Sequence, residues 1–260
     1  MSALVARFGP PLAALAALIA VWEAGVRLGG VAPYVLPAPS LVLATLIADW
    51  SVLSASLWVT LEITFAALAL ALVGGVGLAL LIDGARWLGR GLLPIAVILQ
   101  VTPVVAIAPI LLVWLSPSSA VLVCAFLVAF FPILSNTAMG LASTDKSLLE
   151  MFRLYGAGRW RTLWLLRLPA ALPDFLGGLR IGGGLALIGA IVGELAAGAA
   201  GQGSGLAFRI SEAGYRANVP RMFAALLLIS LTGLAMHAAT SLVSHLALRR
   251  WHDSAVARDA

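Results

Sequence analysis

Charge and cysteine are both scarce in this sequence. Only 10% of its 260 residues are charged, whereas an ordinary soluble domain carries roughly 25%. Cys124 is the single cysteine, which excludes an intrachain disulfide and a cysteine-based metal cluster, and its place in an apolar run predicts a small core residue. Hydrophobic residues make up 62% of the chain, above the roughly 45–50% of soluble domains. The composition therefore predicts an integral membrane protein.

Lysine is almost missing as well. Lys146 is the only lysine, and a phosphate-binding loop of the type G-x-x-x-x-G-K-[ST] requires one. The stretch GLASTDKS, which ends at Ser147, has Asp145 at the second glycine position, where a carboxylate would repel phosphate, and an apolar span precedes it instead of a strand. The three histidines have no carboxylate cluster around them in the sequence. We therefore expect a chain that is no enzyme, hydrolyses no ATP itself and binds neither a metal nor a cofactor.

Long apolar runs are what the chain has in abundance. Six spans are predicted, at about 11–29, 57–82, 92–115, 119–141, 175–199 and 222–248. Their continuity favours helices over barrel strands, which would alternate over about 10 residues. The N-terminal run has the features of a signal peptide but no clean cleavage site, so we expect a retained first span. The predicted fold is an all-α membrane protein whose single transmembrane domain covers residues 1–260.

The basic residues are distributed unevenly between the two sides. If the N-terminus is inside, eleven lie in inner segments: Arg7, Arg86, Arg90, Lys146, Arg153, Arg159, Arg161, Arg167, Arg249, Arg250 and Arg258. Four lie outside, namely Arg27, Arg209, Arg216 and Arg221. This asymmetry predicts that both termini are cytoplasmic. Because the arginines are dispersed and form no single basic face, we expect no nucleic-acid partner.

Two outer segments have recognisable local patterns. After VLPAPS, Ser40 is expected to cap a short helix that runs to about Trp50. A glycine-rich turn at 198–205 precedes LAFRISEAGYRANVP, whose apolar and charged residues alternate at roughly helical spacing. We expect an interfacial amphipathic helix there that stops at Pro220.

The loop between the fourth and fifth spans, 143–173, interrupts the apolar sequence. Two short helices are predicted: one from Asp145 to Tyr155 with Thr144 or Ser143 as its cap, and one from Arg159 to Leu168 that Pro169 ends. Glycines at 156 and 158 separate them. Aromatic and arginine residues together are typical of an interface hot spot, but they are also typical of a helix that lies on anionic lipid. The residues alone leave both interpretations open.

The spacing within this loop resembles a known motif. Glu150, Gly156, Leu166, Leu168 and Pro169 match the loop motif of ABC importer permeases, which runs Glu-Ala-Ala, three residues, Gly, nine residues, Ile, one residue, Leu-Pro. The sequence departs from it in carrying Met151 and Phe152 at the alanine positions and Leu166 at the isoleucine. LPAPS, TPVVAIAPILLVWL, FFPILSNTAMG and GGLRIGGGLALIGAIVGEL extend the resemblance, to the nitrate/sulfonate/taurine branch of this family, over almost the whole chain.

The resemblance implies a type I ABC importer permease of the bacterial inner membrane. Its loop would be a coupling helix set into a groove of an ATPase subunit, present in two copies, which holds the ATP and Mg²⁺. The other implied partners are a second permease copy, most simply a homodimer, and a periplasmic or lipid-anchored solute-binding protein. The residues that the motif assigns to the coupling loop are Glu150, Met151, Phe152, Arg153, Tyr155, Gly156, Ala157, Arg159, Trp160, Leu166, Leu168 and Pro169. The cargo, whether nitrate, a sulfonate, taurine, a pyrimidine precursor or riboflavin, is not indicated by any residue.

Polar residues within the spans are candidates for the translocation path. They are Gln100, Thr102 and Asn136, each of which has hydrogen bonding between helices as its alternative role, and Glu194, which would face either the path or the other permease subunit. The many glycines of the spans predict close helix packing. A self-sufficient secondary transporter or channel is the alternative function, and it would require inverted repeats and broken helices. A membrane enzyme would require a catalytic cluster, which the sequence does not contain.

Overall fold

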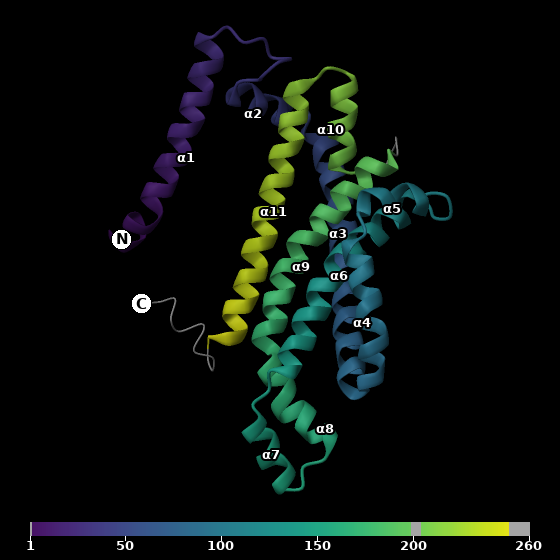
Figure 1. The fold of residues 1–260 in the computed structure, drawn as a ribbon. Coiled ribbons are helices and arrows are strands. Elements are labelled where there is room, and N and C mark those ends of the chain that lie inside the picture. Colours follow the sequence, from purple (N-terminus) through teal and green to yellow (C-terminus); the bar gives the residue numbers. More distant parts are fainter. Residues whose placement is uncertain (1, 199–203, 250–260) are drawn as a thin grey trace. The chain divides into compact units, whose positions relative to one another are not determined.

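The computed structural model describes residues 2–198 and 204–249, and over these ranges the chain forms helices and no strand (Figure 1). The helices are α1 (Ser2–Leu28), α2 (Pro39–Ala48), α3 (Trp50–Gly84), α4 (Arg86–Val101), α5 (Val104–Leu111), α6 (Pro117–Ala142), α7 (Lys146–Leu154), α8 (Arg159–Thr162), α9 (Leu168–Ala197), α10 (Leu206–Tyr215) and α11 (Val219–Leu248). One π-helical turn, Leu163–Arg167, joins α8 to α9. The prediction of an all-α membrane fold is confirmed.

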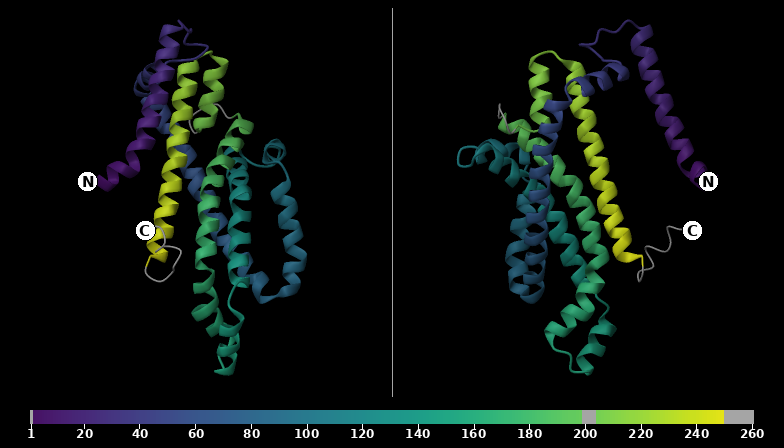
Figure 2. Two further views of the ribbon diagram at one scale, coloured as in Figure 1. Left: turned by 60° about the vertical axis from the view of Figure 1, so that its left-hand side comes forward. Right: turned by 180° about the vertical axis from the view of Figure 1, so that it is seen from behind.

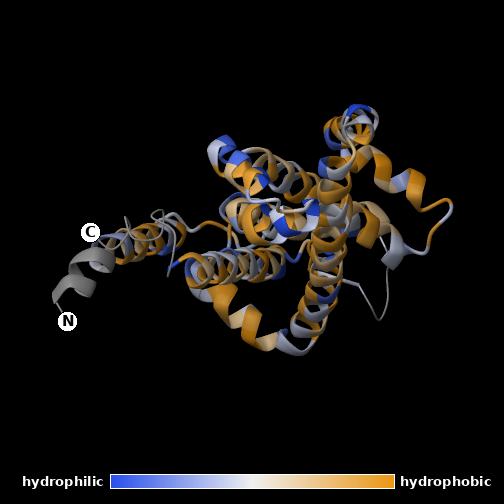
Figure 3. Ribbon diagram, turned by 90° about the horizontal axis from the view of Figure 1, so that it is seen from below, coloured by the Kyte–Doolittle hydropathy of each residue, from blue (hydrophilic) through white to orange (hydrophobic). Residues whose placement is uncertain are grey.

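Five helical stretches are long and apolar enough to cross a membrane: α1 from Gly9, α3, α6, Arg159–Ala197 and α11. Hydrophobic residues colour much of the ribbon in the helices (Figure 3). In α3, residues 63–82 contain no charge, and a rise of 1.5 Å per residue gives this stretch about 30 Å, the thickness of the hydrocarbon layer. Glu62 and Asp83, which flank it, therefore lie at the two head-group levels.

The third predicted span is not one continuous helix. Residues 87–101 of α4 and the helix α5 meet at a bend of 93°, so the apolar segment predicted as the third span, 92–115, is bent. The break falls at Thr102, whose backbone is extended (ψ 124°) because a following proline disfavours the helical region. Pro103 in addition has no N–H to continue the ladder of α4. Figure 2 shows α4 running beside α6 and α5 turning away from its axis.

The helices group into two compact units, each with its own core. The first comprises the described parts of Met1–Val59 and Ala200–Ser230, and the second those of Thr60–Ala199 and Leu231–Ala260. Helices α3 and α11 contribute to both. In the first unit, apolar residues of α2, α3, α10 and α11 form the core, with Val42, Leu53, Leu206, Ala224, Ala225 and Leu228 buried.

Helix α2 begins two residues earlier than predicted, and Ser40 does not cap it. Ala38 is the N-cap residue and Pro39 is the first helical residue, a position where its missing N–H costs nothing. Ser40 instead bonds to α1: its hydroxyl donates to Glu23 at 2.7 Å, and its backbone N–H donates to the same carboxylate at 2.9 Å. Arg27 donates to the Ser40 hydroxyl at 3.0 Å. The serine therefore ties α1 to α2.

Ion pairs hold α10 and the start of α11 within the first unit. Arg221 donates to Asp49 at 2.6 Å, and Arg209 donates both to Ser56 and to Glu212 at 2.8 Å. The hydrogen bond from Arg209 keeps the pKa of the Glu212 carboxyl below its usual value. These contacts anchor the amphipathic helix that the sequence predicts, whereas the preceding glycine-rich turn lies largely outside the described residues.

The amphipathic helix stops earlier than expected, at Tyr215, and Pro220 lies instead in the first turn of α11. A turn with a left-handed residue ends α10: Asn218 N–H donates to Ala213 O at 2.8 Å, and Ala217 N–H donates to Gly214 O at 3.0 Å. Such a turn normally places glycine at its left-handed position. Here Ala217 takes that position with φ 54°, which strains its backbone.

Replacing Ala217 with glycine is therefore expected to stabilise the protein. Relief of the left-handed alanine, about 1–2 kcal/mol, exceeds the roughly 0.5–1 kcal/mol that glycine's extra freedom costs. We expect a gain of about 0.5–1 kcal/mol, seen as a higher midpoint in thermal unfolding in detergent. Ala213→Gly, inside the same helix, is the control and should lower the midpoint. A lower midpoint for Ala217→Gly would contradict the strain argument.

Helices α6 and α9 form a tightly packed pair, called here the stem, in the second unit (Figures 1 and 2). A Cβ added at Gly189 would lie 2.7 Å from Ala125 Cα, and one at Gly178 would lie 2.8 Å from the Pro132 carbonyl oxygen. Real Cβ atoms essentially never make such contacts, so the two backbones touch through glycine. The prediction that glycine permits close helix packing is confirmed.

Candidate functional site: the α7–α8 hairpin

The loop between α6 and α9 forms a hairpin of two short helices at the end of the stem (Figure 1). Asp145 starts α7, because its side chain accepts a hydrogen bond from Ser147 N–H at 2.7 Å. Thr144 and Ser143, the predicted caps, bond instead to carbonyls of α6, those of Leu141 and Gly140. The predicted position of this helix is therefore confirmed, whereas the predicted caps, Thr144 or Ser143, are wrong.

Glycine ends α7 as predicted. Gly156 is left-handed, with φ 69°, and its N–H donates to Arg153 O at 3.0 Å. Ala157 N–H donates to Phe152 O at 2.9 Å, which completes the turn that commonly closes a helix at a glycine. The chain then reverses and begins α8 at Arg159.

The second helix of the loop does not stop at Pro169, contrary to the prediction. A π turn, in which Leu168 N–H bonds to Leu163 O, shifts the hydrogen-bond register just ahead of Pro169. The proline then occupies the first turn of α9, where no donor is required of it. As a result, Arg159–Ala197 is continuously helical, and the hairpin is a direct extension of the stem.

The motif residues divide into an exposed part and an anchored part. Leu166, Leu168 and Pro169 are half-buried, and Leu168 packs against a core that includes Leu134, Leu141 and Ala171. By contrast, α7 has no buried residue. Large apolar side chains are exposed over the hairpin: Leu154 (87%), Tyr155 (84%), Trp160 (75%), Trp164 (65%) and Leu165 (65%). Such a patch marks a surface that another molecule covers.

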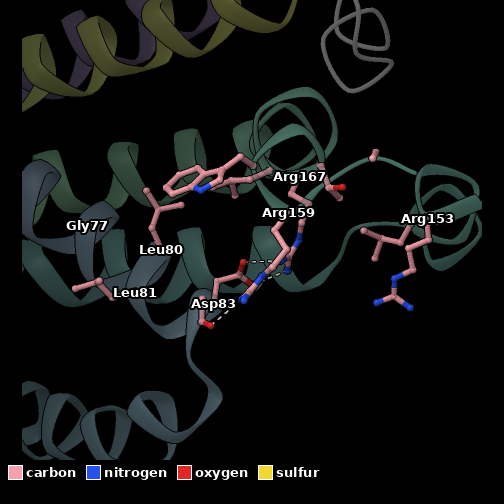
Figure 4. Close-up of a pocket in the computed structure, with 13 residues that line it drawn as sticks. Gly77, Leu80, Leu81, Asp83, Arg153, Arg159 and Arg167 are labelled. Carbon is pink, nitrogen blue, oxygen red and sulfur yellow. Dashed lines mark hydrogen bonds and ion pairs between the residues drawn. The ribbon is translucent and has the colours of Figure 1, made fainter. Parts of the chain in front are cut away.

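An arginine clasp fixes the hairpin to the end of α3. The Arg167 guanidinium forms a bidentate ion pair with Asp83, and its Nη2 also donates to Leu141 O at 3.0 Å. Arg159 donates to the Gly84 carbonyl at 3.0 Å. Figure 4 shows both guanidinium groups directed toward the end of α3. Three segments far apart in sequence are thereby joined at one point.

Asp83 was missed by the sequence analysis, which assigned no role to it. A signal was present, because Asp83 is an acidic residue at the end of a charge-free stretch of α3 and the loop carries several arginines. Which arginine pairs with it depends on the packing of α3 against the stem, and that packing cannot be inferred from residue spacing.

Asp83→Asn is expected to destabilise the clasp. The change leaves the Arg167 guanidinium, 24% exposed, without its counter-charge. Breaking a fully buried pair costs about 3–5 kcal/mol, and partial exposure reduces this to about 1–3 kcal/mol. Thermal unfolding in detergent measures the effect. Glu150→Gln removes an exposed charge from the hairpin and should leave the midpoint unchanged, and equal midpoints for both variants would contradict the clasp.

The four candidates for the translocation path do not come together. Gln100 and Thr102 line a cavity of about 310 Å³ at the α4–α5 break, together with Pro103, Val128 and Pro132 among others. Asn136 lies in the stem, where its amide donates to Pro132 O and its Cβ faces Gly178. Glu194 is buried and accepts a hydrogen bond from Thr60 at 2.8 Å. Their role in transport stays a prediction.

Over residues 2–198 and 204–249, no group of three or more histidine, cysteine, aspartate or glutamate residues could hold a metal ion. The charged side chains of the hairpin are Lys146, several arginines and isolated carboxylates. The chemistry that this arrangement supports is the recognition of a surface by exposed apolar and cationic groups.

Comparison with known proteins agrees with this geometry. Residues 71–250 match the model of the family described as "Binding-protein-dependent transport system inner membrane component". The chain belongs to this family. The matched region includes the end of α3, the stem, the hairpin and α11, so the permease is assigned by the same elements that build the site.

Curated relatives cover most of both chains. The riboflavin transport system permease protein of Chloroflexus aurantiacus is 37% identical over 91% of this permease and 88% of its own length. The formylaminopyrimidine transport permease protein of Halalkalibacterium halodurans is 36% identical over 89% and 91%. A putative aliphatic sulfonates transport permease protein of Bacillus subtilis is 30% identical over 92% and 86%. The permease is thus a membrane component of binding-protein-dependent ABC importers.

Proposed function

We propose that this permease couples ATP hydrolysis in a separate ATPase subunit to the import of a small solute. The observation that carries the proposal is the α7–α8 hairpin, which exposes apolar and aromatic side chains, continues directly into the stem and is tied to the end of α3 by the Asp83–Arg167 clasp. A rigid, apolar projection is suited to transmit the movement of a partner that grips it. The family supports the same assignment.

The proposed assembly has two copies of the permease, two ATPase subunits at the hairpins and a solute-binding protein on the opposite side of the membrane. Because the hairpin belongs to the segments that together carry eleven of the 16 basic side chains, we place this side and both termini in the cytoplasm of a bacterial cell. ATP and Mg²⁺ bind to the ATPase. Closure of the ATPase subunits moves the hairpins, and the stems pass this movement to the membrane helices, which alternate between two states.

The solute belongs to the class that includes riboflavin, pyrimidine precursors, sulfonates, taurine and nitrate. Riboflavin and formylaminopyrimidine are the first compounds to assay, because the relatives named for them are 37% and 36% identical to this chain. The cavity that Gln100 and Thr102 line contains no charged side chain. This lining is compatible with an uncharged cargo.

Purification of the tagged chain from its source cells in mild detergent tests the proposal. We expect a copurifying ATPase that is lost from the double variant Leu154→Ser/Tyr155→Ser, since both side chains are more than four-fifths exposed and the fold does not need them. Leu28→Ser/Tyr34→Ser, also at exposed positions (89% and 69%), is the matched control and should retain the ATPase. The proposal fails if no ATPase copurifies or if both variants retain it.

The α4–α5 break is a feature that a self-sufficient secondary transporter would share, since such proteins use broken helices at their binding sites. Solute flux by the purified permease in liposomes without ATP or ATPase would favour that function. Flux that requires both would favour the importer.

A further inference from the structure

A crevice of about 890 Å³ lies between the end of α3 and the α7–α8 hairpin. Its volume is within the range of about 300–1,000 Å³ that small-molecule sites occupy. On one side it is lined by Gly77, Leu80 and Leu81, from the last turns of α3 (Figure 4). These residues lie just within the charge-free stretch that Asp83 ends, so the crevice crosses from the hydrocarbon edge to the head-group level.

The opposite wall of the crevice is cationic. Arg153, Arg159 and Arg167 line it, and Asp83 is the only carboxylate among the lining residues. Because Asp83 neutralises Arg167 through the bidentate pair, two positive charges are left without a counter-charge. Among the described residues neither Arg153 nor Arg159 forms an ion pair. Arg159 donates one hydrogen bond, to the Gly84 carbonyl. Figure 4 shows Arg153 across the crevice from the apolar wall.

We propose that this crevice binds an anionic phospholipid of the adjoining leaflet. Its phosphate lies between Arg153 and Arg159, and the first part of an acyl chain lies along Gly77, Leu80 and Leu81. A basic pocket beside membrane helices is a recognised type of site for anionic head groups. The inference rests on the proposed function only in calling this leaflet the cytoplasmic one.

The apolar wall selects a lipid over a soluble phosphate compound. A free phosphate neutralises the arginines but leaves the apolar α3 wall exposed to water, whereas a phospholipid buries its apolar part against that wall. A neutral lipid would also bury its apolar part, but it brings no net negative charge to the two arginines. The lipid also links α3 to the hairpin at the point where the clasp does, and this makes it a structural component of the coupling region.

Native mass spectrometry of the full chain in detergent, titrated with phosphatidylglycerol or phosphatidylcholine, tests the proposal. We expect the wild type to retain phosphatidylglycerol in preference. Arg153→Gln/Arg159→Gln should bind it about tenfold more weakly or worse. Arg90→Gln/Arg161→Gln removes two exposed arginines that do not line the crevice and should bind as the wild type does. Equal losses in both variants would mean general attraction to basic residues and would overturn the proposal.

A second pair of variants tests the apolar wall at constant charge. Gly77→Phe fills the crevice from α3, where an added Cβ meets nothing within 4 Å, and should abolish retention of the lipid without a clash. Gly91→Phe is the control: an added Cβ there also meets nothing within 4 Å, but the residue lies on α4 and not in the crevice, so the variant should retain the lipid. Retention by Gly77→Phe would overturn the crevice as the site, and this test stands even if the double arginine variant fails to fold.

A soluble phosphate compound and the ATPase are the two alternative occupants of the crevice, and each is tested in competition with the lipid. Glycerol 3-phosphate, the soluble head-group analogue, should not displace the bound lipid at concentrations equal to it, and complete displacement would assign the site to a soluble phosphate. The complex with the copurified ATPase should keep the lipid. Loss of the lipid on ATPase binding would assign the crevice to the ATPase. Failure of ATPase copurification bears on the proposed function and leaves the lipid measurement on the chain alone unaffected.

Discussion

Gly156→Asp is expected to abolish ATP-driven uptake while the permease remains folded. The residue is left-handed (φ 69°), and an added Cβ there meets nothing within 4 Å, so the change costs about 1–2 kcal/mol of backbone strain and causes no clash. The new carboxylate lies at the tip of the hairpin, on the surface that we assign to the ATPase. We expect a loss of transport of about tenfold or more, with ATP hydrolysis by the ATPase retained.

Gly30→Asp is the matched control for this prediction. Gly30 is also left-handed (φ 60°), also has open space where its Cβ would be, and lies between α1 and α2, outside the hairpin. The substitution therefore introduces the same strain and the same charge at a place without a coupling role. Uptake in membrane vesicles, with the amount of folded protein checked by size-exclusion chromatography, should fall only for Gly156→Asp. Equal uptake by the two variants would show that the hairpin is not the coupling element.

Gly189→Leu is expected to prevent the stem from forming. The Cβ alone would lie 2.7 Å from Ala125 Cα and 3.1 Å from Cys124 O, and these are backbone atoms that cannot rotate away. Overpacking against flexible side chains costs about 1–3 kcal/mol, and a clash with backbone should exceed that range. Since α6 and α9 form the most extensive helix contact of the described chain, we expect little or no monodisperse protein.

Gly184→Leu, five residues earlier on the same helix, separates packing from propensity. An added Cβ there meets nothing within 4 Å, and leucine forms helices better than glycine by about 1 kcal/mol. We expect a yield and a thermal midpoint at or above those of the wild type. Normal yields for both variants would mean that the stem tolerates separation of its helices. The proposal that the stem transmits the movement of the hairpin as a rigid unit would then be wrong.

Local chemistry explains which elements were predictable from the sequence. The spans follow from runs of apolar residues, because a helix is the simplest way to satisfy the backbone within lipid. The end of α7 follows from Gly156, whose backbone conformation is costly for other residues. The close stem follows from the glycines of the spans.

What the sequence did not reveal depends on contacts between distant segments. The Asp83–Arg167 pair requires knowing which of several arginines faces α3, and Ser40 bonds to Glu23 of α1 when capping α2 would have been its local choice. The continuation of the helix through Pro169 depends on the π turn, a register shift that no residue pattern announces. The 93° bend at Thr102 had a local signal in Pro103, but hydrophobicity alone does not reveal a bend within an apolar segment.

Binding of an ATPase to the hairpin is the central element of the proposed function. Cross-linking tests it most directly, because Cys124 is buried and can be replaced by alanine to give a cysteine-free chain. A cysteine is then placed at Tyr155 of the hairpin (84% exposed) or at Tyr215 of α10 (93% exposed), and a bifunctional thiol reagent is applied in membranes of the source cells. We predict a cross-linked ATPase from position 155 and none from position 215. An ATPase joined at both positions or at neither would contradict the claim.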